Sequence, residues 1–264
     1  MLGIFDSGMG GLSVLKAIRE QSPFVDIVYF GDTANMPYGN KDLVTLEKLT
    51  IEAMRLLRQE GATQIISACN SISSSVIRPM MELFGIDHQR LVEMVGPTVE
   101  ALRAGEFGQL AFVGTPATIR SGMYQKAFVE VGLSVKMFFS AELASAIEFG
   151  ESQEKMNRII DQILDEVTAT DCDTLVLGCT HYPLVKNLFD EQIAARGLST
   201  KTFDPAHAVA VHALKHHSAF GTGIIKFILS KDSPNFSAYV AKLFDPRSFT
   251  IECLEKVYSP NVAA

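Results

Sequence analysis

Short apolar runs alternate along the chain with longer segments in which apolar residues recur every three or four positions. The runs are rich in β-branched and aromatic residues and cover residues 2–5, 26–30, 64–67, 110–113 and 174–177. Short buried strands separated by amphipathic helices are typical of parallel βαβ units. The pattern therefore predicts an α/β fold of mainly parallel sheet flanked by helices.

One of the intervening segments carries clear helix signals. Leucine and methionine recur at three- to five-residue spacing from Leu43 to Leu57, and Gly61 follows the run. Asn40 precedes the run and is of a type that caps helix N-termini. We expect a crossover helix here, capped by Asn40 and ended by Gly61.

The pattern occurs twice. Residues 65–71 resemble residues 175–181, and residues 2–8 resemble residues 110–116 more loosely, in both cases about 110 residues apart. Any two strand ends can look alike, but two matches at nearly one offset favour two similar lobes. We expect a first lobe of residues 1–96 plus 206–264 and a second of residues 97–205, divided at two proline-containing junctions, Gly96-Pro97 and Asp204-Pro205.

The charge of the chain narrows the choice of partners. Its formal net charge is −7 and it has no run of Lys or Arg, which argues against nucleic acid and against anionic membranes. No stretch approaches the length of an apolar membrane span. The first residues lack a basic region and include Asp6, unlike a signal peptide. We therefore expect a cytoplasmic protein with reduced cysteines and a small-molecule partner.

Two cysteines occupy matching positions in the repeat. Cys69 and Cys179 each follow an apolar strand and precede polar residues that can begin a helix. Ligands of open α/β sheets bind at the carboxyl ends of strands, so two facing lobes would place one thiol on each wall of a cleft. A helix N-terminus stabilises thiolate, which predicts lowered pKa values. Either cysteine alone could be a small buried hydrophobe, but the pair favours acid/base chemistry.

The loops beside these cysteines are suited to anions. Residues 6–11, Asp6-Ser7-Gly8-Met9-Gly10-Gly11, follow the first strand, and such glycine-rich turns present backbone N–H groups at a helix N-terminus. Ser13 replaces the last glycine of the dinucleotide fingerprint and no Walker lysine follows, which disfavours nucleotides. A plain turn capped by Asp6 is the other alternative. Neither Arg nor Lys occurs in the candidate loops at 6–11, 31–39, 69–75 and 178–183.

The sequence contains no clear motif for a cofactor or for a metal ion. No lysine stands at a strand end in a setting that suggests a Schiff base, so pyridoxal phosphate is not indicated and no cofactor is expected. Cys172, Cys179 and His181 lie close in sequence but match no common zinc spacing. His212, His216 and His217 can share a helix face, yet they lack the glutamate of a metalloprotease motif, which favours a solvated face.

These segments, in this order, resemble glutamate racemases of the aspartate/glutamate racemase superfamily, over roughly residues 1–205. The matching pieces are Asp6-Ser7-Gly8-x-Gly10-Gly11, Gly31-Asp32-Thr33-Ala34-x-x-Pro37-Tyr38-Gly39, Ala68-Cys69-Asn70-Ser71, Gly114-Thr115-x-Ala117-Thr118 with Ser121-Gly122, and Gly178-Cys179-Thr180-His181-Tyr182-Pro183-Leu184. Ser71 stands where threonine is usual and keeps the hydroxyl, which leaves the choice between glutamate and aspartate open.

The resemblance implies a cofactor-independent isomerase with its site between two α/β lobes, usually in a homodimer. It implies that Cys69 acts on D-glutamate and Cys179 on L-glutamate, assisted by Asp6, His181 and Glu148. The implied substrate contacts are Asp6, Ser7, Tyr38, Gly39, Asn70, Ser71, Thr180 and His181. It further implies a role in supplying D-glutamate for peptidoglycan.

Two alternatives remain. An aspartate or hydantoin racemase of the same superfamily would use the same two thiols on a different substrate. A non-catalytic protein that binds a small ligand on this fold would need neither thiol. The cysteine pair therefore favours the racemase.

Overall fold

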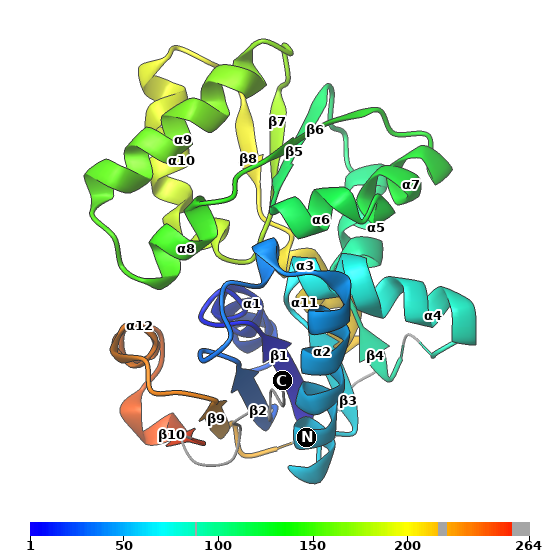
Figure 1. Cartoon of the computed structure of the whole chain (residues 1–264), viewed down its shortest axis with the longest axis vertical. Coiled ribbons are helices and arrows are strands. Elements are labelled where there is room, and N and C mark those ends of the chain that lie inside the picture. Colours follow the sequence, from blue (N-terminus) through cyan, green and yellow to red (C-terminus); the bar gives the residue numbers. More distant parts are fainter. Residues whose placement is uncertain (88, 216–220, 255–264) are drawn as a thin grey trace, which may run out of the picture.

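The computed structural model describes residues 1–87, 89–215 and 221–254, and in them two parallel sheets are flanked by helices (Figure 1). The six-stranded sheet of these residues has the order β10-β9-β2-β1-β3-β4, and the four-stranded sheet has the order β6-β5-β7-β8. The strands are β1 Leu2–Asp6, β2 Ile27–Gly31, β3 Gln64–Ser67, β4 Leu91–Val92, β5 Leu110–Gly114, β6 Val135–Phe139, β7 Thr174–Gly178, β8 Lys201–Phe203, β9 Ile225–Leu229 and β10 Phe249–Cys253. The predicted α/β class is confirmed.

The helices lie on both faces of each sheet (Figure 1). They are α1 Leu12–Gln21, α2 Leu43–Gln59, α3 Asn70–Ile72, α4 Arg78–Phe84, α5 Val95–Ala104, α6 Pro116–Arg120, α7 Met123–Glu130, α8 Leu143–Glu148, α9 Gln153–Thr168, α10 Lys186–Ala195, α11 Ala206–Leu214 and α12 Pro234–Leu243. Shorter turns are η1 Tyr38–Asn40, the π-helical η2 Ser73–Ile77, η3 Tyr182–Val185 and η4 Pro246–Ser248. No helix in the described ranges is long and apolar enough to span a membrane.

The two sheets share one topology. The order β2-β1-β3-β4 in the first lobe is the order β6-β5-β7-β8 in the second, with all neighbours parallel. The strands β3 and β7, which precede Cys69 and Cys179, are equivalent in these two units. The sequence repeat therefore reflects two similar lobes, as predicted, and β9 and β10 extend the first sheet beyond the repeat.

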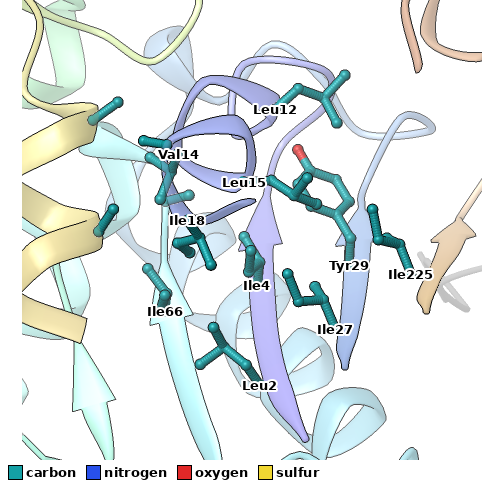
Figure 2. Close-up of a cluster of buried hydrophobic side chains, with 14 of the residues drawn as sticks. Leu2, Ile4, Leu12, Val14, Leu15, Ile18, Ile27, Tyr29, Ile66 and Ile225 are labelled. Carbon is teal, nitrogen blue, oxygen red and sulfur yellow. The ribbon is translucent and has the colours of Figure 1, made fainter. Parts of the chain in front are cut away.

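Helix α1 shows how the core fixes a site loop. Its apolar residues Leu12, Leu15 and Ile18 fall on one face because they are three residues apart, and that face packs on the first sheet beside Ile4 and Tyr29 (Figure 2). Burying each such side chain contributes about 1.5–3 kcal/mol. The glycine-rich loop at residues 6–11 is thereby held between a buried strand and a buried helix.

One predicted cap is wrong. Helix α2 covers the predicted crossover segment, but its N-cap is Asp42, whose carboxylate accepts a hydrogen bond from the Thr45 backbone N–H at 2.9 Å. Asn40 instead ends the η1 turn. The carboxylate two residues closer to the helix satisfies the free N–H groups, so the helix starts later than an Asn40 cap would require. Gly61 follows with φ +86°, the left-handed region that glycine favours.

The chain crosses between the lobes twice, at α5 and α11, and these two helices contact each other. The expected boundary at residues 96 and 97 falls in the first turn of α5, and the division at 96 and 205 stays a prediction. His212, on α11, is half-buried, and its Nδ1 lies 3.7 Å from Glu100 Oε2. The other two histidines of the predicted helix face, His216 and His217, lie outside the described residues.

Candidate active site

Both cysteines lie at the carboxyl ends of equivalent strands. Cys69 follows β3 and Cys179 follows β7, and each side chain is only 5% exposed. Negative charge on Cys179 is among the influences that raise the pKa of Cys69, after burial and the charge of Asp6. The two thiols are therefore electrostatically coupled across the lobe interface.

The carboxylate of Asp6, at the end of β1, joins the two lobes. Its Oδ1 accepts a hydrogen bond from the Gly8 N–H at 2.9 Å, and its Oδ2 accepts one from the Thr180 hydroxyl of the second lobe at 3.1 Å. Burial raises the pKa of this fully buried group, and the positive charge of His181 opposes that shift. Asp6 can consequently hold a proton at a higher pH than an exposed aspartate.

The glycine-rich loop binds anions, but those observed are the protein's own carboxylates. The N–H of Gly8 binds Asp6, and the N–H of Met9 donates to Glu148 Oε2 of the second lobe at 2.8 Å. A Cβ built on Gly8 would lie 2.2 Å from Glu148 Oε2. Glycine is required here because the backbone approaches the other lobe so closely.

Glu148, His181 and Cys179 form a line of acid/base groups. His181 Nε2 lies 2.5 Å from Glu148 Oε2, and His181 Nδ1 lies 3.8 Å from Cys179 Sγ. Burial alone lowers the pKa of His181, but hydrogen bonds to Cys179 and Glu148 outweigh it and raise that pKa well above the usual value. The imidazole can therefore hold a proton next to the thiol.

The lowered pKa predicted for Cys69 is wrong. Cys69 does cap the N-terminus of α3, and the N–H groups of Ile72 and Ser71 favour its thiolate. Burial and the nearby negative charge of Asp6 outweigh them and raise the pKa of the thiol. Burial away from water destabilises the thiolate by more than the N-terminus of one short helix stabilises it.

Asn70 and Ser71 face partners from the second lobe. Ser71 Oγ lies 2.8 Å from Thr115 Oγ1, which also lies 3.0 Å from Thr118 Oγ1. The Tyr124 hydroxyl donates to Asn70 Oδ1 at 2.5 Å. Thr115 and Tyr124 were not predicted as site residues. Thr115 belongs to one of the motifs on which the sequence resemblance rests, whereas Tyr124 resembles an ordinary core residue of an amphipathic helix.

The remaining predicted contacts lie nearby. Ser7 is buried directly after Asp6. Tyr38 donates its hydroxyl to the carboxylate of Asp32, within the first lobe. Gly39 abuts the second lobe, since a Cβ added there would lie 2.7 Å from Thr115 Cβ. Asp32, which orients Tyr38, was missed as a site residue although it follows the second predicted strand.

The structure does not bring Cys172 to this site. Cys172 precedes β7 while Cys179 follows it, so a whole strand separates their positions. In the residues that the structure describes, no three His, Cys, Asp or Glu side chains gather where they could hold a metal ion.

A model of the Asp/Glu/Hydantoin racemase family matches residues 8–213. The glutamate racemase of Persephonella marina is 34% identical over 239 residues, which cover 89% of this chain and 90% of that protein. The crystal structure of glutamate racemase isoform RacE1 from Bacillus anthracis aligns with a TM-score of 0.84, 25% identity and 98% of both chains. The glutamate racemase structure from Aquifex pyrophilus aligns with a TM-score of 0.77 and 31% identity, over 97% of this chain and 99% of that one.

Proposed function

Because this chain belongs to the Asp/Glu/hydantoin racemase family and is therefore an isomerase, we propose that it interconverts L- and D-glutamate, with Cys69 and Cys179 as its proton-transfer groups. The observation that carries the proposal is the equivalent placement of the two thiols, one at the end of β3 and one at the end of β7. Racemisation needs two acid/base groups on opposite faces of Cα, and two facing lobes supply one each.

In the direction from L to D, the Cys179 thiolate removes the α-proton, so the Cα–H bond breaks and an S–H bond forms. The electron pair left on Cα is shared with the adjoining carboxylate. The Cys69 thiol then gives its proton to the opposite face of Cα and becomes the thiolate. The reverse direction exchanges the two roles, so each turnover ends with the protonation states swapped.

The surroundings of the thiols suit these starting states. Burial and Asp6 raise the pKa of Cys69, which keeps it a thiol until substrate arrives. Protonated His181 beside Cys179 stabilises negative charge on that sulfur. Glu148 holds the imidazole in place through Nε2, and Asp6 is positioned beside Thr180 to support proton movement on the other side.

The substrate carboxylates would be bound without cations. The loops around the thiols contain neither Arg nor Lys, so Asn70, Ser71, Thr180 and the backbone at Ser7 and Gly39 are the proposed donors. Several relatives at 32–38% identity are glutamate racemases, which supports glutamate over aspartate. We extend the proposal to a cytoplasmic homodimer that supplies D-glutamate for peptidoglycan, as the family resemblance suggests.

Circular dichroism of the purified protein with L-glutamate or L-aspartate, and no added cofactor, tests the substrate. We expect the glutamate signal to decay and the aspartate signal to persist. Decay with aspartate alone would overturn the substrate assignment. A single peak at twice the chain mass in sedimentation analysis is expected for the dimer.

Solvent deuterium exchange at Cα tests the roles of the thiols. Cys179→Ser should abolish exchange from L-glutamate, and Cys69→Ser should abolish exchange from D-glutamate. Cys172→Ser is the matched control because this buried cysteine lies at the other end of β7, and it should keep both activities. Unchanged exchange in either site variant contradicts the mechanism.

A further inference from the structure

Tyr124 connects the core of the second lobe to a polar residue of the first. Its ring is completely buried in the first turn of α7, with its centroid 4.4 Å from that of Phe112 and 5.9 Å from that of Phe128. Its hydroxyl crosses the interface and donates to Asn70 Oδ1 at 2.5 Å. The aromatic packing leaves this hydroxyl little freedom to move, so its position relative to the second sheet is fixed.

The side-chain amide of Asn70 has its acceptor in use and its donor unpaired. Its Oδ1 accepts from Tyr124, whereas its Nδ2 is buried and has no hydrogen-bond partner within the described part of the chain. Asn70 is 2% exposed and directly follows Cys69. A buried amide N–H₂ without a partner costs folding free energy, and proteins retain such groups where a ligand can satisfy them.

We infer that Tyr124 is a positioning residue that sets the orientation of the Asn70 amide. With Oδ1 held by the phenol, Nδ2 is the atom left to donate to a substrate carboxylate beside Cys69. In the flipped amide Oδ1 would face that carboxylate, and two acceptors repel each other. This inference rests on the proposed function, because it takes the ligand of Asn70 to be a carboxylate of the amino acid.

The lobe arrangement adds a condition. Tyr124 belongs to the second lobe and Asn70 to the first, so the amide is oriented only while the two lobes are in contact. Free substrate approaching separated lobes would meet an amide that can adopt either orientation. Contact between the lobes is thus needed for Asn70 to present Nδ2 to the substrate carboxylate.

The test is a double-mutant cycle on KM and kcat. In Tyr124→Phe we expect KM for both enantiomers to rise about tenfold while kcat falls less than about threefold, because binding rather than proton transfer is impaired. Combined with Asn70→Ala, the tyrosine substitution should have almost no further effect on KM, since its target is gone. The inference would be overturned if the KM of the double variant rose by the product of the two single effects. It would also be overturned if Tyr124→Phe left KM unchanged.

A core variant away from Tyr124 separates positioning from general loosening of the second lobe. Leu164→Ala should lower the melting temperature without raising KM, because Leu164 is buried in a core cluster that does not include Tyr124. If the parent protein shows no racemisation, the proposed function fails. The same cycle is then read from the Kd of L-glutamate by calorimetry, where equal affinity of parent and Tyr124→Phe contradicts the inference separately.

Discussion

His181 Nε2 and the Met9 N–H both bind one oxygen of Glu148, at 2.5 Å and 2.8 Å. Glu148 and His181 belong to the second lobe and Met9 to the first, so a single carboxylate oxygen links the imidazole beside Cys179 to the loop that follows β1. The state of this carboxylate therefore bears both on proton transfer and on how closely the lobes approach.

Glu148→Gln should lower kcat/KM for L-glutamate about 100-fold, a typical loss when an acid/base group is impaired. The substitution removes the negative charge of Glu148, which together with Cys179 raises the pKa of His181, while the lowering effect of burial remains. The limb of the pH–rate profile that His181 controls should therefore move to lower pH. Polarimetry across the pH range measures both effects, and Glu151→Gln, at an exposed position paired with Lys155, is the control. An unshifted profile would count against this role of Glu148.

Asp6→Asn should abolish most activity and yet stabilise the fold at alkaline pH. The pKa of Asp6 is raised in the folded protein, so folding favours the protonated form, and ionisation costs stability as pH rises through that pKa. Asparagine has no such cost, so the variant should gain about 1 kcal/mol over the parent between pH 5 and pH 8. Urea unfolding at the two pH values provides the measurement. A difference in stability between variant and parent that does not grow in favour of the variant as pH rises would refute the prediction.

Arg78→Met should destabilise the protein more at pH 8 than at pH 5. Glu93 is buried and its pKa is raised by that burial, while Arg78, 3.1 Å away, and backbone N–H groups partly compensate. Without Arg78 the ionised Glu93 lacks its cation, at a cost of about 3 kcal/mol at pH 8. At pH 5 part of that cost disappears because Glu93 is protonated. Glu93→Gln in the same background should remove the extra pH dependence, and Glu82→Gln, which removes the exposed partner of Arg78, should change little.

Gly10→Ala should reduce activity more than stability. A Cβ at Gly10 would lie 2.6 Å from His181 Nδ1 and 2.6 Å from Thr180 Oγ1, both on the opposite lobe. The lobes can relieve this clash by separating slightly, which leaves each core intact but breaks the contacts of the site. We expect at least a tenfold loss of kcat/KM with a small change in melting temperature. Gly132→Ala, at an open site with φ +77°, is the control for backbone strain alone, and equal activity losses in both variants would contradict the prediction.

The sequence predicts the central strands because these are apolar over their whole length. Strands β1, β5 and β7 are buried on both faces, and each was recognised as an apolar run. The strand β6 was not, since it is a half-exposed edge strand, and β4 has only two residues. Edge and very short strands lack the continuous apolar signal of the interior.

Residues of the candidate site could be predicted where a short sequence motif marks them. Cys69 and Cys179 could be found because each lies at a strand end in a repeated motif. The contact of Tyr124 with Asn70 could not, since the two residues are distant in sequence and belong to different lobes. The helix position of Cys69 predicts the wrong direction for its pKa, because the thiol is buried in a core cluster with residues distant in sequence, such as Phe5 and Phe30.

The late return of the chain to the first sheet has a consequence for synthesis on the ribosome. Strand β9, residues 225–229, pairs with the side of β2 that faces away from β1, so β2 remains an open edge until that segment has emerged. The second sheet, from Leu110 to Phe203, is complete before then. The half of the protein that is translated first is therefore the last to finish folding, and its unpaired edge is open to aggregation meanwhile.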